Sequence, residues 1–162
     1  MSYKMRVRAA AILIHKNELL LNEFGGGQYY NFTGGGIEAN ETAKQAVARE
    51  VMEESGLTVE VGDLLFTLEY EPKSCKNYYG DNGSITLFFS CKLNTEVQPQ
   101  VPSHPDVNPD DPSITSTCKW IPLSELKDIY FIPPIYESLM NYVRTGTFAP
   151  SFWETHVHET LA

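Results

Sequence analysis

The segment from Thr42 to Ser55 constrains the fold of this chain more than any other feature. At about 100° per residue, its apolar residues fall on one side of a helix. They are Ala43, Ala46, Val47 and Val51. A helix with one apolar side has to pack against another layer of structure, and the segments around it are rich in strand-forming residues. The pattern therefore predicts an α/β fold in which this helix covers a sheet.

The ends of this helix are marked by residues that commonly begin and end helices. Asn40 or Thr42 is expected to cap the first turn, because both side chains can accept a hydrogen bond from a free backbone N–H. Gly56 is expected to end the helix after Ser55, since glycine adopts the left-handed conformation found there. A run of glycines, Gly34 to Gly36, precedes the helix and lets the backbone approach ions or phosphate oxygens closely.

Three glutamates occupy the last turns of the same helix, where they are unfavourable. Glu50 and Glu54 project into the apolar sector, and Glu53 lies on its edge. Their mutual repulsion and the negative end of the helix dipole each cost a few tenths to about 1 kcal/mol. A hard divalent cation, Mg²⁺ or Mn²⁺, would offset these charges. The alternative is a solvated helix face whose glutamates pair with Lys44 or Arg49.

Strands are predicted on both sides of the helix in the sequence. The predicted strands are Val7–His15, Glu18–Glu23, Leu57–Glu71, Ser84–Leu93 and, as the last one, Thr117–Ile121. The first two are expected to form a hairpin through Lys16-Asn17. Residues 72–83 and 94–116 are predicted to be loops, the second a long one of a kind that is often functional.

The C-terminal part is predicted to contain a short helical turn at Ser124–Leu126 and a final helix. Pro133-Pro134 is expected to open this helix, which would run to about Arg144. The tail after Gly146 carries no pattern that we can interpret. With 162 residues, 42% of them hydrophobic, the chain can bury one sizeable core, so residues 1–162 are expected to form a single domain.

Charge and cysteine content exclude several classes of protein. The net charge of -9 argues against binding to a nucleic-acid polymer, which requires a positive surface. The apolar run Ala9–Ile14 is too short for a membrane span or a signal-peptide core. Cys75, Cys91 and Cys118 lack metal-ligand spacing and indicate reduced thiols. We therefore expect a cytoplasmic protein that is not associated with a membrane.

The segment from Gly35 to Leu57 resembles the signature of the Nudix hydrolase family. Gly35 is followed after five residues by Glu41, and after seven more by Arg49-Glu50-Val51-Met52-Glu53-Glu54-Ser55-Gly56-Leu57. Every fixed position of the signature is filled, so the match is far more specific than a lone glycine motif. Thr33, where the family often has Pro, and Asn40, where it often has Gly, are departures that affect the loop and not the family.

The resemblance implies an α/β/α sandwich with a mixed β-sheet and a metal-dependent active site. Glu50 and Glu54 would ligate the metal ions, with Glu53 as a further ligand or support. The backbone carbonyl of Gly34 and the side chain of Glu38 would add ligands. Arg49 and Glu41 are similar to a structural ion pair of the family, so Arg49 would position the carboxylates. A homodimer is an expectation that rests on the resemblance alone.

The implied reaction is hydrolysis of a phosphoanhydride bond in a nucleoside diphosphate linked to another group, with water attacking phosphorus. Nucleoside triphosphates and ADP-ribose are candidate substrates. The alternatives are a catalytically idle Nudix domain that senses a nucleotide, and a plain interaction domain. The candidates for the general base are Glu53, Asp81, His104, Asp106, Asp110 and Asp111.

Substrate-contacting residues are only partly indicated by the sequence. Arg6 and Arg8 on the first strand are candidates to neutralise phosphates. Aromatic side chains can stack on a base regardless of its identity. The aromatic candidates are Tyr29, Tyr30, Tyr70, Tyr78, Tyr79 and Phe131.

Overall fold

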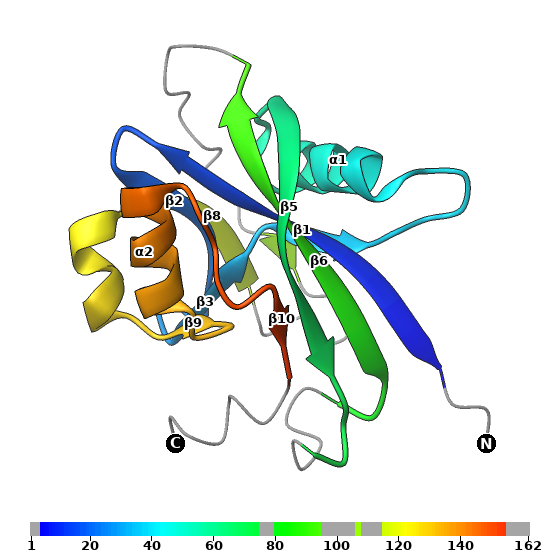
Figure 1. The fold of residues 1–162 in the computed structure, drawn as a ribbon. Helices are drawn as coiled ribbons and strands as arrows, with labels where there is room; N and C mark the ends of the chain where they lie inside the picture. Colours follow the sequence, from blue (N-terminus) through cyan, green and yellow to red (C-terminus); the bar gives the residue numbers. More distant parts are fainter. Residues whose placement is uncertain (1–3, 75–79, 95–105, 108–114, 155–162) are drawn as a thin grey trace.

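The computed structural model describes residues 4–74, 80–94, 106–107 and 115–154 (Figure 1). The elements are β1 (Met5–His15), β2 (Glu18–Phe24), β3 (Tyr29–Phe32), β4 (Gly34–Gly36), α1 (Ala43–Ser55), β5 (Val59–Tyr70), β6 (Gly83–Leu93), β7 (Asp106–Val107), β8 (Thr115–Pro122), the 3-10 helix η1 (Leu123–Asp128), β9 (Phe131–Ile132), α2 (Tyr136–Thr145) and β10 (Phe152–Trp153). The strands form one mixed sheet in the order β10-β5-β6-β1-β2-β3-β9, to which β4, β7 and β8 are attached.

Strand β1 is the centre of this sheet and has two partners along one edge. On its other edge it runs parallel to β6, from Met5 opposite Gly83 to Leu13 opposite Cys91. Strands β2 and β4 share the remaining edge of β1. Strand β2 pairs only with the C-terminal end of β1, while β4 pairs antiparallel with the N-terminal half of β1. The chain therefore places the glycines of β4 directly against the central strand.

The predicted hairpin between the first two strands is confirmed. Lys16 and Asn17 form a two-residue turn and both have positive φ, at 48° and 63°. Two successive residues of this conformation match the twist of paired strands, and asparagine tolerates it well. Beyond the turn, β2 also pairs antiparallel with β8 along its whole length.

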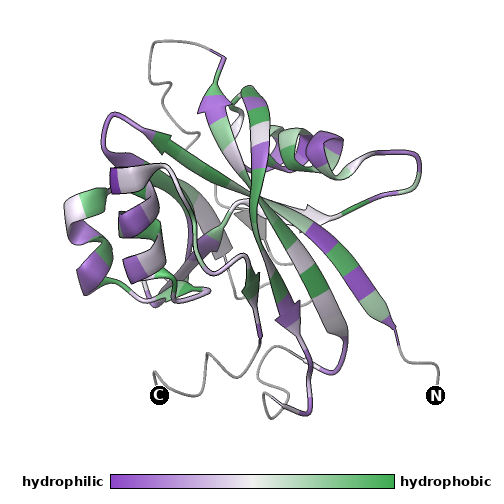
Figure 2. Ribbon diagram, in the orientation of Figure 1, coloured by the Kyte–Doolittle hydropathy of each residue, from purple (hydrophilic) through white to green (hydrophobic). Residues whose placement is uncertain are grey.

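The sheet is buried on both faces, which confirms the predicted α/β/α sandwich. Ala9, Ala11 and Leu13 of β1 belong to a core cluster that includes Ala46, Val47 and Val51 of α1, the stripe expected from the sequence. Ala10 and Ile12, the alternate residues, belong to a cluster with Leu139 of α2. Figure 1 shows α1 on one side of the strands and α2 with η1 on the other, and Figure 2 shows hydrophobic residues along the central strands.

The C-terminal elements differ from the prediction in two places. Helix α2 begins at Tyr136 with Ile135 as its N-cap, so the two prolines precede the helix and do not form its first turn. The predicted last strand became β8, but β9 and β10 follow it, and Asp106–Val107 of the predicted long loop pairs with β8. The predicted helical turn after β8 is confirmed as η1.

The tail after Gly146, which the sequence left without interpretation, completes the core. Phe148 is buried and stacks on Phe66 with the ring centroids 4.4 Å apart. Phe66 in turn stacks on Phe88 of β6 at 4.2 Å. Strand β10 then pairs parallel with β5, so the tail closes the outer edge of the sheet.

Two of the three cysteines lie within the described residues. Cys91 and Cys118 are free and buried, while Cys75 lies outside the described residues. None of the helices in the described ranges is long and apolar enough to span a membrane.

We predict that Phe148→Ala lowers the free energy of unfolding by about 3 kcal/mol, the usual cost of truncating a buried phenylalanine. Phe152→Ala is the matched control, because Phe152 lies in the same tail but is half-exposed, and it should cost less than about 1 kcal/mol. Urea unfolding of both variants measures the difference. Equal effects would show that Phe148 contributes no more to the core than a surface residue.

Candidate active site

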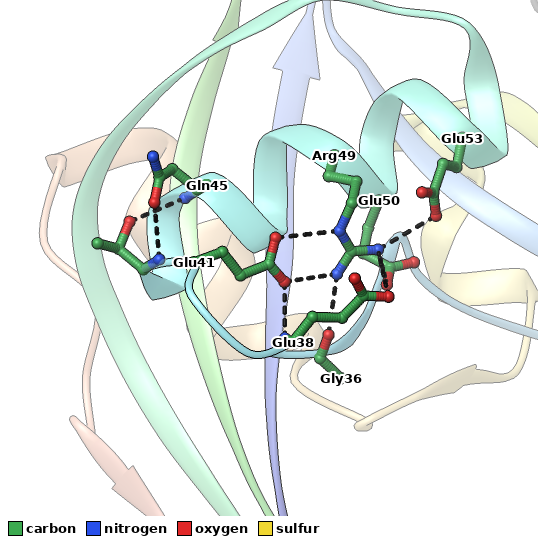
Figure 3. Close-up of polar contacts among 8 residues, drawn as sticks. Gly36, Glu38, Glu41, Gln45, Arg49, Glu50 and Glu53 are labelled. Carbon is green, nitrogen blue, oxygen red and sulfur yellow. Dashed lines mark hydrogen bonds and ion pairs between the residues drawn. The ribbon is translucent and has the colours of Figure 1, made fainter.

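Helix α1 begins and ends where its capping residues require. Thr42, one of the two expected caps, accepts a hydrogen bond from the Gln45 N–H, and the Gln45 side chain accepts one from the Thr42 N–H (Figure 3). Gly56 ends the helix with φ 73°. Asn40 instead adopts the left-handed conformation in the preceding loop, with φ 67°. These caps fix the two ends of α1, and with them the positions of Glu50, Glu53 and Glu54 along the helix axis.

Arg49 holds the loop before α1 against the helix. Its guanidinium binds the Glu41 carboxylate through two bonds, Nη2 to Oε1 at 2.7 Å and Nε to Oε2 at 3.1 Å. Its Nη2 also donates to the Gly36 carbonyl at 3.0 Å, as Figure 3 shows. The pair implied by the family resemblance is therefore formed, and Arg49 holds the pKa of Glu41 below its usual range.

The same guanidinium also gathers three of the predicted metal ligands. Its Nη1 lies 2.8 Å from Glu50, 3.2 Å from Glu53 and 3.9 Å from Glu38. The Glu53 and Glu38 side chains are 57% and 69% exposed, whereas that of Glu50 is 15% exposed. Within the described ranges, no three His, Cys, Asp or Glu side chains are grouped so that they could hold a metal ion. The alternative interpretation of the glutamates was a helix face on which they pair with Lys44 or Arg49. In the described part of the chain, Arg49 is the one of these two residues that pairs with them.

Glu54 lies on the opposite, buried side of this cluster. The Gly34 N–H donates to its Oε2 at 3.1 Å. The pKa of Glu54 is raised to about 7, mainly by burial, with a smaller contribution from the charge of Glu50; Asn22, the Gly34 N–H and the charge of Arg8 act in the opposite direction. Glu50 and Glu54 are therefore close enough to interact electrostatically, although Glu54 is absent from the contacts of Arg49.

Two glycines make room for these carboxylates. A Cβ atom on Gly35 would overlap the carboxylate of Glu50, and one on Gly34 would overlap the Ala9 carbonyl oxygen. Strand β4 can therefore lie between β1 and the carboxylates only because it has no side chains here. The result is a site with carboxylate and backbone oxygens and little steric cover, which is the donor chemistry that suits Mg²⁺ or Mn²⁺.

A cavity of about 430 Å³ lies next to β4. Residues from β1, β3, β5 and β6 line it, together with Gly34 itself. The Arg8 Nε and the Asn31 Oδ1 are buried and have no hydrogen-bond partner among the described residues. Burial and the neighbouring charge of Arg6 lower the pKa of Arg8, while Glu54 and Glu50 act in the opposite direction. The cavity is thus positively charged at the end nearest the glutamates.

The structure places only some of the predicted substrate and base candidates here. Tyr29, Tyr70 and Asp81 line the cavity, together with Arg6 and Arg8. Tyr30 and Phe131 are buried in the core. Several candidates lie outside the described residues: Tyr78, Tyr79, His104, Asp110 and Asp111. Asp106 lies in β7, and nothing is described of its side chain.

Two polar residues of the site were not identified from the sequence. Asn31 lines the cavity and Asn22 touches Glu54 from β2. Asn22 interrupts the apolar run Leu19-Leu20-Leu21 within a strand, which is the one signal that marks it. Asn31 lies between aromatic residues, and no comparable signal in the sequence marks it.

Comparison with known proteins agrees with this geometry. A family model described as the NUDIX domain matches residues 5–142. A search of curated proteins found no match. A Nudix hydrolase from Nitrosomonas europaea superimposes with a TM-score of 0.63 at 19% identity, over 91% of this chain and 93% of that chain.

Two other solved structures have the same fold. The MutT protein of Methanosarcina mazei Go1 gives a TM-score of 0.62 at 19% identity, over 90% of this chain and 98% of that one. An ADP-ribose pyrophosphatase of Streptococcus suis gives 0.58 at 20% identity, over 92% and 98%. With the family match over most of its length, the chain belongs to the NUDIX domain family and is an enzyme of the Nudix hydrolase type.

We predict that stability without metal falls as the pH rises from 4.5 to 7. The folded chain keeps the Glu54 proton up to a pKa of about 7, whereas the unfolded chain releases it near 4.5. The folded state therefore loses stability across this interval, by at most about 3 kcal/mol.

Urea unfolding in EDTA at several pH values measures this loss. Glu54→Gln should remove most of the slope and be more stable than the native chain above pH 7, because it buries no charge. Glu53→Gln is the control, because the exposed Glu53 side chain should leave the slope unchanged. A slope that persists in Glu54→Gln would contradict the assignment.

Proposed function

We propose that this protein hydrolyses a phosphoanhydride bond in a nucleoside diphosphate linked to another group, with Mg²⁺ or Mn²⁺ as cofactor. One observation carries the proposal: the carboxylates of Glu50 and Glu54 lie against the glycines of β4, and Gly34 also lines an arginine-lined cavity. The first suits a hard cation and the second suits phosphate oxygens. A diphosphate whose metal ions face the glutamates and whose oxygens face the arginines would use both features.

The residues have distinct parts in the proposed reaction. Glu50 and Glu54 would hold the cation, with Glu53, Glu38 and the Gly34 carbonyl as further oxygen ligands. When bound, a divalent cation supplies a water of lowered pKa and stabilises charge on the leaving phosphate. Arg49 positions Glu50 through their 2.8 Å contact and ties the loop to the helix. Arg49 must release Glu50 or share it when the cation binds.

The cavity supports a nucleotide as the substrate. Arg6 and Arg8 would bind phosphate oxygens, and Tyr29 or Tyr70 would contact the base. The structural relatives that are named as an ADP-ribose pyrophosphatase, a UDP-X diphosphatase and a MutT protein support a nucleoside triphosphate, ADP-ribose or a related compound. Asp81, which lines the cavity, is the general-base candidate outside the signature that the described residues favour.

A nucleotide sensor without turnover is the second candidate function. The contacts of Arg49 with Glu50 and Glu53 favour it, because they satisfy both carboxylates without a cation. Both candidates imply a single-domain cytoplasmic protein that acts on a small molecule, and for both a homodimer is proposed from the family resemblance alone. They differ only in whether the bound nucleotide is cleaved.

The deciding experiment measures phosphate and pyrophosphate release from nucleoside triphosphates, ADP-ribose, nucleotide sugars and dinucleoside polyphosphates, each with Mg²⁺, Mn²⁺ or EDTA. We expect cleavage of one group of compounds with metal and none in EDTA. Glu54→Gln should abolish turnover while the protein remains folded. Full activity in this variant would contradict the role of Glu54, and binding without cleavage across the panel would favour the sensor.

We predict that Arg8→Met raises the KM of the cleaved nucleotide about ten- to a hundredfold, since a hydrogen bond to a charged group contributes about 1.5–3 kcal/mol. The variant retains the length of the side chain but has no charge. Lys44→Met is the matched control, because Lys44 is exposed on α1 and does not line the cavity. An unchanged KM in Arg8→Met would exclude Arg8 from phosphate binding.

A further inference from the structure

A row of polar side chains crosses the sheet next to Glu54. Asn22 on β2 pairs in register with Cys118 on β8 and with Asn31 on β3. Residues directly opposite each other on neighbouring strands project from the same face of a sheet. Cys118 belongs to the core cluster under α1, so the row faces the helix that carries the glutamates.

Asn22 joins this row to Glu54. It is only 4% exposed, and its Oδ1 accepts a hydrogen bond from the Cys118 thiol with a sulfur–oxygen distance of 3.0 Å. Its side chain also lies within hydrogen-bonding reach of Glu54 and lowers the pKa of that carboxyl. Together with the Gly34 N–H, Asn22 gives Glu54 donors from two different strands. The carboxylate is thus held from β2 and β4 as well as by its own helix.

The chemistry of the two neighbours fixes which way the Asn22 amide points. The Asn22 Oδ1 accepts the hydrogen bond from the Cys118 thiol, so the amide nitrogen, which can only donate, is left to face Glu54. The amide oxygen then faces Cys118, which requires a donor there. Burial raises the pKa of the Cys118 thiol, so the thiol keeps its proton and remains that donor. The reversed amide would place its oxygen against the carboxylate and leave the thiol proton unpaired.

A purely structural role does not account for asparagine at this position. Leu19, Leu20 and Leu21 precede it and are fully buried, so a fourth apolar residue would continue the strand at lower cost. Burying an amide is unfavourable unless its hydrogen bonds are made. The thiol and the carboxylate are the partners that compensate this cost.

We infer that Asn22 is a positioning residue of the active site, which orients the Glu54 carboxylate for cation binding, and that Cys118 sets the orientation of Asn22. The inference rests on the proposed function, in which Glu54 is a metal ligand. A carboxylate has about four lone-pair positions, so two donors leave room for a cation. Asn22 touches neither the substrate nor the reacting atoms and acts only through Glu54.

The test compares Mn²⁺ binding, measured by isothermal titration calorimetry without nucleotide, between the native protein and four variants. Asn22→Leu should weaken Mn²⁺ binding about ten- to a hundredfold, the usual effect of losing a residue that orients a ligand. It should lower kcat at saturating Mn²⁺ and leave KM within about twofold. Cys118→Val should give a smaller loss in the same direction, and Cys118→Ser, which keeps a donor, should restore Mn²⁺ binding.

Cys91→Val is the matched control. Cys91 is a buried thiol of the same core cluster, but its sulfur donates to the Phe89 carbonyl and not to Asn22. It should bind Mn²⁺ like the native protein, and all variants should show cooperative thermal unfolding. The inference is overturned if Asn22→Leu binds Mn²⁺ normally, or if Cys91→Val loses as much affinity as Cys118→Val.

Failure of the proposed function gives a different result. A native protein that binds Mn²⁺ but cleaves no compound of the panel would refute the hydrolase. The comparison of Mn²⁺ affinities would still decide the role of Asn22, because calorimetry does not depend on turnover. A native protein that binds no Mn²⁺ would overturn the inference about Asn22.

Discussion

The close approach of β4 to β1 is the constraint on which the site depends. Three consecutive alanines, Ala9 to Ala11, and the glycines of β4 bring these two strands together where larger side chains would overlap. This contact forces β2 to pair with β1 only beyond it, so the edge of the central strand is shared. Glu50 and Glu54 of α1 and Arg8 of β1 consequently lie close enough to influence each other electrostatically.

Because the chain as a whole is acidic, the positive charges of the arginines on β1 are important for binding an anion. A protein with a net charge of -9 repels polyanions in general, so an anionic substrate needs a local source of positive charge. Arg6 and Arg8 lie two residues apart on one face of β1 and are next to a cavity, although their mutual repulsion disfavours this placement. The charges of Glu54 and Glu50 offset part of this repulsion at Arg8 in the free protein.

The features of the fold that the sequence predicts correctly are those that depend on a local pattern of residues. The apolar stripe of α1, its end at Gly56 and the Lys16-Asn17 hairpin depend on neighbouring residues, and each is as predicted. The contributions of Phe148 and Asn22 could not be predicted, because both depend on contacts between segments distant in sequence. Phe148 meets Phe66 only after the tail returns to the sheet, and Asn22 meets Glu54 only when β2 lies under the helix.

The unfavourable glutamates of α1 are stabilised in two ways in the free protein. On the exposed side, the Arg49 guanidinium neutralises Glu50 and Glu53. On the buried side, the Gly34 N–H and Asn22 favour the charged form of Glu54, while burial has the larger effect and raises its pKa to about 7, which favours the protonated form. A cation that binds here has to compete with the guanidinium for Glu50 and with the proton for Glu54. Under the proposed function, its affinity therefore depends on how well both carboxylates are already oriented, so the residues behind them would belong to the proposed metal site.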